Sequence, residues 1–206
     1  MAAVRPRVRA CGRWALLLEL DSAEEVAATA RTLRAAALPE VVELVPAART
    51  VLVEVLAGTG LDRVRDAVSE VDPSAAGADE GARHTIPVVY DGEDLQLVAD
   101  TAGIGTDEVV ALHTGAEFTV AFCGFAPGFG YLSGLPEQLC QPRLASPRSA
   151  VPSGSVGLAD VYSCVYPRRS PGGWRLIGRT DLTMFDAAAD PPARLAPGDR
   201  VRFEAQ

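Results

Sequence analysis

Residues 161–180 read VYSCVYPRRSPGGWRLIGRT, and this stretch decides the fold of the second half of the chain. Two short β-prone runs, Val161–Tyr166 and Trp174–Ile177, are separated by a segment whose prolines and glycines favour a tight turn. Further β-prone runs lie on both sides of it, at His84–Tyr90, Glu117–Phe122, Leu182–Phe185 and Arg200–Phe203. Many short strands joined by Pro- and Gly-containing turns predict a β-barrel or a β-sandwich.

Two short helices are expected within this half of the chain. The residue pattern predicts helices over Leu95–Ala102 and Thr106–His113. Thr106 is expected to cap the second helix, because its hydroxyl can accept a backbone hydrogen bond and the acidic Asp107 and Glu108 follow in the first turn.

The first eighty residues predict a separate small α/β unit. A strand over Trp14–Leu20 is followed by a helix that Asp21 or Ser22 caps and Pro39 ends, and a second amphipathic helix covers Leu61–Val71. A hairpin is expected between the helices, with strands at Val41–Val45 and Thr50–Leu56. The order β-α-β-β-α suits a ferredoxin-like unit with its helices on one face of a sheet.

Residues 72–83 read DPSAAGADEGAR and are expected to form a linker, because the segment is small, polar and contains proline and glycine. The boundary predicts two domains, residues 1–80 and 84–206. The fold class is therefore α+β, with an α/β unit followed by a β-rich domain.

Composition excludes several kinds of function. The chain has no lysine, which excludes a Schiff-base lysine and a phosphate loop of the Gly-Lys-Ser/Thr type. The net charge of −8 argues against non-specific binding of nucleic acid. The apolar run Trp14–Leu18 is shorter than the core of a signal peptide, and no window of about 18 apolar residues exists, so no membrane contact is expected and the cytoplasm is the expected location.

Metal binding is not expected from the residue types available. The only histidines are His84 and His113, and no pair of cysteines has CxxC spacing. The cysteines are expected to be reduced and mostly buried, as is usual in the cytosol: Cys11, Cys123, Cys140 and Cys164.

The charge of residues 118–180 differs from that of the rest of the chain. This segment holds six arginines and two acidic residues, whereas the remainder is acidic, and it is also rich in glycine and proline. A cationic, turn-rich segment is typical of backbone shaped around an anion, although arginines exposed to solvent give the same pattern. Arg143, Arg148 and Arg179 are the expected anion-binding residues, and the other arginines of the segment, Arg168, Arg169 and Arg175, are expected on the surface.

Four short motifs within the segment could carry chemistry. The first, GFAPGFGYL at 124–132, places Phe125, Phe129 and Tyr131 as flat walls on a tight turn, or as a plug at a barrel end. The second, PRLASPR at 142–148, holds two arginine forks that suit carboxylate or phosphate, or that pair with acidic residues elsewhere in the chain.

The third motif, VPSGSVG at 151–157, places Ser153 and Ser155 around a glycine whose backbone could form an anion-binding concavity. The fourth, SPGGW at 170–174, is followed by IGRT at 177–180. The fourth motif makes a tight turn to Trp174 and adds Arg179 and Thr180 at the same open end of the predicted barrel.

Together these motifs identify a resemblance. The succession PGFGYL, PR…PR, VPSGSVG, YP, SPGGW and IGRT resembles the KipI-type family, which includes the B subunit of the bacterial ATP-dependent 5-oxoprolinase. That family is similar to the first half of the allophanate-hydrolase-like, carboxyltransferase-type module of urea-degrading enzymes. The resemblance implies a cyclophilin-like β-barrel for the second domain. It also implies two partner proteins of the same complex, the A subunit plus a KipA-type C subunit.

The resemblance implies an amide hydrolase subunit that is inactive alone. With its partners it would open 5-oxo-L-proline to L-glutamate, using ATP with Mg²⁺ in the assembled complex and holding neither stably by itself. Two alternatives stay open: a regulatory protein that inhibits a sensor histidine kinase, and a subunit of an allophanate- or urea-degrading amide hydrolase.

The resemblance also implies which residues act. Arg148, Arg179 and His113 are the expected catalytic residues, and no metal ligands are expected. The expected substrate-binding residues are Phe129, Tyr131, Arg143, Ser153, Ser155, Tyr162, Ser163, Trp174 and Thr180. The chain departs from the family at residues 160–164, which read DVYSC where the family is closer to Gly-Asn-Gln-Thr-Gly. This departure affects the expected substrate more than the expected fold.

Overall fold

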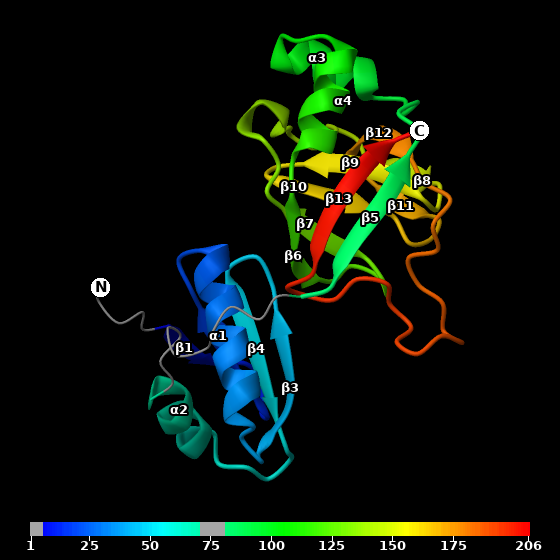
Figure 1. The fold of residues 1–206 in the computed structure, drawn as a ribbon. Helices are drawn as coiled ribbons and strands as arrows, with labels where there is room; N and C mark the ends of the chain where they lie inside the picture. The colour runs from blue at the N-terminus through cyan, green and yellow to red at the C-terminus, as the bar shows by residue number, and fades with distance from the viewer. Residues whose placement is uncertain (1–5, 71–80) are drawn as a thin grey trace. The chain divides into compact units, whose positions relative to one another are not determined.

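The computed structural model describes residues 6–70 and 81–206, and the chain divides into two compact units, Met1–Asp79 and Glu80–Gln206 (Figure 1). Most of the predicted linker, at 72–80, lies outside the described residues. Its last residue, Arg83, already belongs to the first strand of the second unit.

The first unit is an antiparallel sheet of four strands with two helices (Figure 1). Its strands have the spatial order β1-β2-β4-β3. The elements are β1 (Arg7–Ala10), β2 (Ala15–Glu19), α1 (Ala23–Ala36), β3 (Val41–Pro46), β4 (Thr50–Val55) and α2 (Leu61–Glu70). Strand β1 was not predicted; it pairs with β2 along its whole length.

One face of this sheet carries the core of the first unit. Alternate residues of β2 and β4 point to the same side, so Leu16, Leu18, Val51 and Val53 pack together with the apolar faces of both helices. The predicted cap of α1 is confirmed for Ser22, whose Oγ accepts a hydrogen bond from the N–H of Glu25 at 3.2 Å. The helix ends at Ala36, before Pro39.

The second unit is a nearly closed β-barrel. Its main sheet has the order β12-β9-β10-β7-β6-β13-β5, and all neighbours are antiparallel except β13 and β5, which lie side by side in Figure 1. The strands are β5 (Arg83–Val88), β6 (Phe118–Cys123), β7 (Gly130–Ser133), β9 (Ser155–Ala159), β10 (Tyr162–Val165), β12 (Arg175–Arg179) and β13 (Arg200–Ala205).

The two ends of this sheet meet just after β5. Val89 and Arg179 exchange backbone hydrogen bonds of 2.9 Å in both directions, and Asp94 N donates to Leu176 O at 2.9 Å. The sheet therefore curves back on itself through β12, which accounts for the barrel form.

Two helices and a small ribbon complete the second unit. Helices α3 (Leu95–Ala102) and α4 (Thr106–Gly115) were predicted, but the N-cap of α4 is Gly105 and not Thr106, which is already the first helical residue. Strands β8 (Arg148–Val151) and β11 (Ser170–Gly172) form a separate two-stranded ribbon, and a 3-10 turn lies at Glu137–Leu139. The strand predicted at Leu182–Phe185 was wrong, because that segment makes only one isolated bridge, from Phe185 to Ala193.

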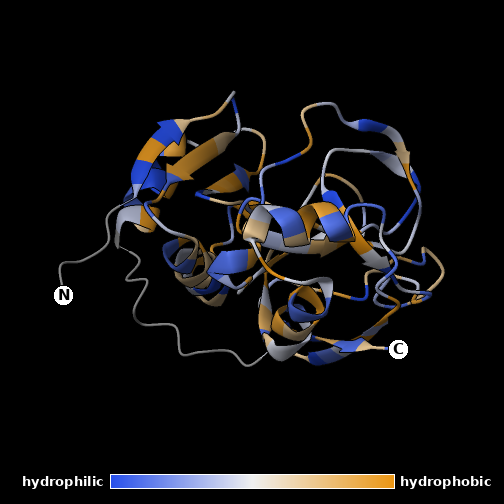
Figure 2. Cartoon of the chain, turned by 90° about the horizontal axis from the view of Figure 1, so that it is seen from above, coloured by the Kyte–Doolittle hydropathy of each residue, from blue (hydrophilic) through white to orange (hydrophobic). Residues whose placement is uncertain are grey.

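The strands around β10 have two buried faces. Val165 packs in the large core together with residues of α3 and α4, whereas Cys164 and Tyr166 pack in a second cluster with Phe129 and Trp174. Figure 2 shows helices that carry both hydrophobic and hydrophilic residues, as expected when one face of a helix is buried. Within residues 6–70 and 81–206, no helix has the length and apolar character needed to cross a membrane.

Candidate active site

Seven aromatic residues form one connected group, here named the aromatic cluster. Phe129 lies at its centre, with ring centroids 5.1 Å from Tyr131, 5.2 Å from Phe125 and 5.6 Å from Trp174. Phe122 stacks on Tyr131 at 4.2 Å. The members are Phe122, Phe125, Phe129, Tyr131, Tyr162, Tyr166 and Trp174. The cluster brings together four predicted substrate-binding residues (Phe129, Tyr131, Tyr162, Trp174), which come from segments far apart in the sequence.

Arg143 is the arginine that adjoins this cluster. Its guanidinium carbon lies 6.0 Å from the centre of the Trp174 ring, at the outer limit of a cation–π contact. Burial raises the pKa of Tyr131, and the charge of Arg143 partly opposes that rise. The Nε of Arg143 lies 3.8 Å from the carboxylate of Asp160, and both side chains are more than half exposed. Such a loose, exposed pair leaves the guanidinium able to bind another anion.

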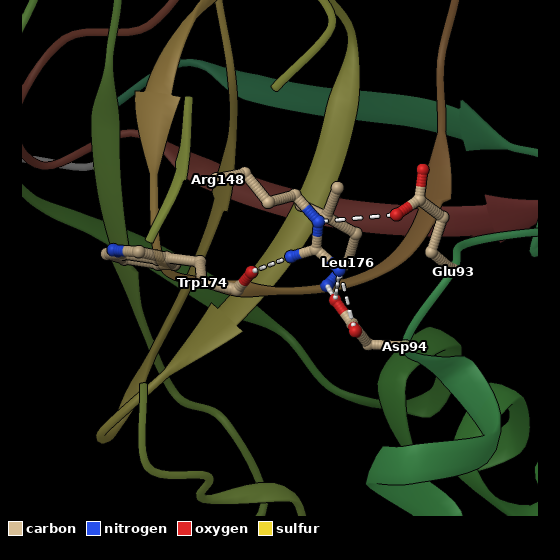
Figure 3. A network of polar contacts seen from close by, with 5 residues as sticks. All are labelled: Glu93, Asp94, Arg148, Trp174 and Leu176. Atoms are coloured by element: carbon tan, nitrogen blue, oxygen red, sulfur yellow. Dashed lines mark hydrogen bonds and ion pairs between the residues drawn. The ribbon is translucent and has the colours of Figure 1, made fainter. Parts of the chain in front are cut away.

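Arg148, a predicted catalytic residue, is instead held inside the second unit (Figure 3). Its Nη2 donates to both carboxylate oxygens of Asp94 at 2.8 Å, and its Nε donates to Glu93 at 3.2 Å. A third contact runs from Nη1 to the carbonyl of Trp174 at 3.4 Å. The hydrogen bond to Asp94 is the main cause that raises the pKa of Arg148.

The carboxylate of Asp94 is almost fully buried and has a second role. It also accepts a hydrogen bond from Leu176 N at 2.7 Å, so it joins the start of α3 to β12 and, through Arg148, to the β8–β11 ribbon (Figure 3). In this placement the charge of Arg148 is compensated within the fold, and its guanidinium is already hydrogen-bonded to carboxylates. Its expected catalytic role stays a prediction.

Arg179 also has a carboxylate partner. Its Nε donates to Asp91 at 3.0 Å, and both side chains are about half exposed. Arg179 ends β12 at the closure of the barrel. The predicted trio of arginines is therefore divided: Arg148 and Arg179 bind acidic residues that precede α3, whereas Arg143 lies over the ring of Trp174 in the aromatic cluster.

His113 and Ser163 lie in the large core and not at the aromatic cluster. The imidazole has no exposed surface; its Nε2 lies 3.0 Å from Ser163 Oγ and its Nδ1 lies 2.7 Å from the hydroxyl of Tyr90. Burial lowers the pKa of His113 to about 3, so the ring is neutral near pH 7. The ring stacks on Phe203 at 4.3 Å. Both side chains join α4 to the barrel wall, and the expected catalytic role of His113 and substrate-binding role of Ser163 stay predictions.

The predicted anion-binding concavity at VPSGSVG does not form. The N–H of Gly154 donates to Tyr166 O at 2.8 Å, and the N–H of Ser155 donates to Pro152 O at 3.4 Å. Gly154 has a φ of +81°, and a Cβ there would clash with the carbonyl oxygen of Thr180, so only glycine fits. The motif is a junction between strands.

Two hydroxyl groups around this junction bind the backbone. Ser153 Oγ donates to Pro167 O at 3.0 Å, and Thr180 Oγ1 accepts from Leu182 N at 3.3 Å. Ser155 and Thr180 are both buried. These contacts give Ser153 and Thr180 a structural role at the junction, and the expected substrate-binding role of all three residues stays a prediction.

Arg175 was expected on the surface, and that prediction was wrong. Only 9% of the residue is exposed. Its Nη1 donates to Thr101 Oγ1 at 2.7 Å and to the side-chain oxygen of Gln141. The sequence has no local signal for this burial, because both partners lie far away along the chain. Among the described residues, no group of three or more His, Cys, Asp or Glu side chains is arranged to hold a metal ion.

Comparison with known proteins identifies relatives of the whole chain. Residues 6–195 match the family described as carboxyltransferase domain, subdomain C and D. The chain is 42% identical to the B subunit of 5-oxoprolinase from Escherichia coli O157:H7 over 211 residues, which cover 98% of this chain and 97% of that relative.

Longer proteins contain a similar region. The crystal structure of TTHA0988 has a TM-score of 0.80 and 32% identity; the match covers 97% of this chain and 40% of that one. Urea amidolyase of Saccharomyces cerevisiae is 28% identical over 118 residues, which are 53% of this chain and 6% of that protein. The extent of the family match and the near-complete overlap with the Escherichia coli relative show that the chain belongs to the carboxyltransferase domain family, subdomain C and D.

Proposed function

We propose that this chain is a subunit of an ATP-dependent 5-oxoprolinase, which hydrolyses the cyclic amide of 5-oxo-L-proline to L-glutamate. The observation that carries the proposal is the 42% identity to the B subunit of a 5-oxoprolinase along nearly the full length of both chains. In this reaction water adds to the ring carbonyl, the ring C–N bond breaks, and the nitrogen takes a proton to become the amino group of glutamate. Hydrolysis of ATP supplies the free energy.

The substrate site proposed for this chain is the aromatic cluster with Arg143. 5-Oxoproline is a small, nearly flat ring that carries one carboxylate. Tyr131 is partly exposed and suits contact with such a ring, the buried Trp174 supports Tyr131 and Arg143 from behind, and the guanidinium of Arg143 suits the carboxylate. In this proposal Asp160 occupies the guanidinium in the absence of substrate and is displaced when substrate binds.

ATP and Mg²⁺ are proposed to bind in the assembled complex, which adds the A subunit of the oxoprolinase together with its KipA-type C subunit. The residues of this chain do not fit ATP well by themselves: the sequence has no lysine, and Arg148 and Arg179 are paired with carboxylates. When bound, ATP would activate the amide by phosphorylation. The isolated chain is therefore proposed to be inactive.

We also propose the finer fold assignments. The order β1-β2-β4-β3 supports a ferredoxin-like first unit in which β1 occupies the edge of the sheet beside β2. The nearly closed barrel with two helices supports a cyclophilin-like second unit. A cytoplasmic location stays a prediction.

The experiment is reconstitution with these two partner proteins, followed by measurement of ATP consumption with and without 5-oxo-L-proline. Arg143→Gln is expected to raise KM for 5-oxo-L-proline at least about ten-fold, because a hydrogen bond to a charged group contributes about 1.5–3 kcal/mol. Arg168→Gln is the matched control, since Arg168 is an exposed arginine of the same charged segment, and its KM is expected to be unchanged. An unchanged KM in Arg143→Gln would remove Arg143 from the site.

The similarity to urea amidolyase favours allophanate as the substrate to compare. Turnover of allophanate in place of 5-oxoproline by the same assembly would support that second function. Absence of turnover with either substrate would contradict an enzymatic role and favour the regulatory alternative.

A further inference from the structure

Phe125 has an unusual combination of backbone and exposure. Its φ is +67°, and 61% of the residue is exposed to solvent. The N–H of Ala126 donates to Gly124 O at 2.8 Å, which makes a γ-turn centred on Phe125. A γ-turn with positive φ is rare and strained, and a bulky side chain adds to the strain. The residue therefore combines an unfavourable backbone with an apolar ring in water.

The surrounding loop fixes this conformation. Gly124 N donates to Phe129 O at 3.1 Å, and Phe129 N donates to Ala126 O at 3.0 Å, so both ends of the loop are held between β6 and β7. A glycine at 125 would meet the same backbone requirement without strain. The backbone conformation therefore gives no reason for phenylalanine, and strained residues that persist in this way cluster at functional sites.

The ring of Phe125 contacts the proposed substrate site. It makes an edge contact with Phe129 at 5.2 Å between centroids, and Phe129 in turn contacts Trp174 at 5.6 Å. Arg143 lies over that same Trp174 ring. Phe129 and Trp174 are buried but Phe125 is mostly exposed, so its free face is available to a ligand at the outer edge of the aromatic cluster.

We propose that Phe125 is a substrate-contacting wall of the site at the aromatic cluster, held in a strained turn so that its ring covers the ring of a bound cyclic amide. The inference rests on the proposed function and adds a specificity-determining residue to the same site. The carboxylate of the ligand binds Arg143, and its apolar ring atoms lie against Phe125. Substrates that lack the ring lose this contact.

The test separates the ring from the strain by using two variants in the reconstituted enzyme. Phe125→Ala removes the ring and keeps a side chain in the strained turn, whereas Phe125→Gly removes both. Each is expected to raise KM for 5-oxo-L-proline about five-fold with kcat nearly unchanged, the size expected for one aromatic contact. Leu97→Ala, at an exposed apolar residue of α3, is the control and leaves KM unchanged.

Thermal unfolding of the full chain tests the strain. Phe125→Gly is expected to unfold at a higher temperature than Phe125→Ala, the reverse of the usual order for these residues in a loop. Equal unfolding temperatures, or the usual order, would show that the turn stores no strain and would overturn that part of the inference.

The kinetic outcomes are also distinct. An unchanged KM in Phe125→Ala, with wild-type enzyme active, overturns the inference and leaves the proposed function standing. Weaker assembly with the partner proteins at unchanged KM also overturns it and makes Phe125 a docking residue. A wild-type assembly without 5-oxoproline-dependent turnover overturns the proposed function itself, and the substrate role of Phe125 with it.

Discussion

Replacing Arg148 by methionine is expected to lower the free energy of unfolding of the second unit by about 2–3 kcal/mol. The estimate starts from about 3–5 kcal/mol for removing one partner of a fully buried ion pair. The Asp94 side chain is 8% exposed but that of Arg148 is 21% exposed, so water can partly rehydrate the remaining carboxylate. Asp94 also keeps its hydrogen bond from Leu176 N.

Urea unfolding of the full chain measures this loss. Trp14 belongs to the first unit and Trp174 to the second, so a Trp14→Phe background lets tryptophan fluorescence report on the second unit alone. A loss of this size is expected to lower the thermal midpoint by roughly 6–15 °C. Neighbouring Glu93 contributes little, because its side chain is 75% exposed.

A double-mutant cycle isolates the pair itself. Arg148→Met and Asp94→Asn, made singly and together, are expected to show a coupling free energy above about 1.5 kcal/mol. The matched pair is Arg143 with Asp160, whose longer distance and high exposure predict coupling below about 0.5 kcal/mol. Equal coupling energies would show that the Arg148–Asp94 pair does not stabilise the fold as argued. If Arg148→Met abolishes turnover without loss of stability, Arg148 is a catalytic residue.

Three further predictions concern stability. Burial lowers the pKa of His113 from the ordinary 6.5 to about 3, so between these two values the unfolded chain binds a proton that the folded chain does not. As the pH is lowered from 6.5 to 3, the free energy of unfolding is therefore expected to fall by up to about 1.4 kcal/mol per pH unit. His113→Asn should flatten that slope in urea titrations at pH 7.5 and 5.0, and an unchanged slope would count against the neutral ring. Gly154→Ala is expected to prevent folding or cost more than about 3 kcal/mol, whereas Gly103→Ala, also at positive φ but with open space around it, should cost only about 1 kcal/mol; similar soluble yield and stability for both would contradict this. Ser22→Ala is expected to cost about 1 kcal/mol in the first unit, measured by chemical unfolding, and a neutral effect would mean that the cap does not stabilise α1.

The sequence pattern predicted those helices and strands that are specified by residues within or next to them. The bounds of α3 matched the structure, because Asp94 precedes it and Gly103 ends it in the left-handed region. Strand β1 was missed because Val8 is the one residue of this short strand that is partly buried. The flanking Arg7 and Arg9 resemble the positively charged start of a signal peptide. The β8–β11 ribbon was missed because both strands are short and β11 contains proline and glycine, which normally mark turns.

The site was harder to predict, because partners in space are distant in sequence. Four of the predicted substrate-binding residues do lie in contact with one another: Phe129, Tyr131, Tyr162 and Trp174. Nothing near Arg148 indicates that its charge is taken by Asp94, which lies 54 residues away. Likewise, the side of β10 to which Ser163 points depends on the pairing of that strand, so its contact with His113 was not accessible from spacing.

The parallel pairing of β5 with β13 has a consequence for how the protein is made. Residues 83–88 are synthesised long before residues 200–205, yet β13 is the strand that lies between β5 and β6 in the sheet. Contacts so distant in sequence slow folding, and until they form, Ile86 and Val88 lie on a strand with an open edge. The nascent chain is therefore expected to be prone to aggregation until β13 has been synthesised, and to depend on chaperones during that interval.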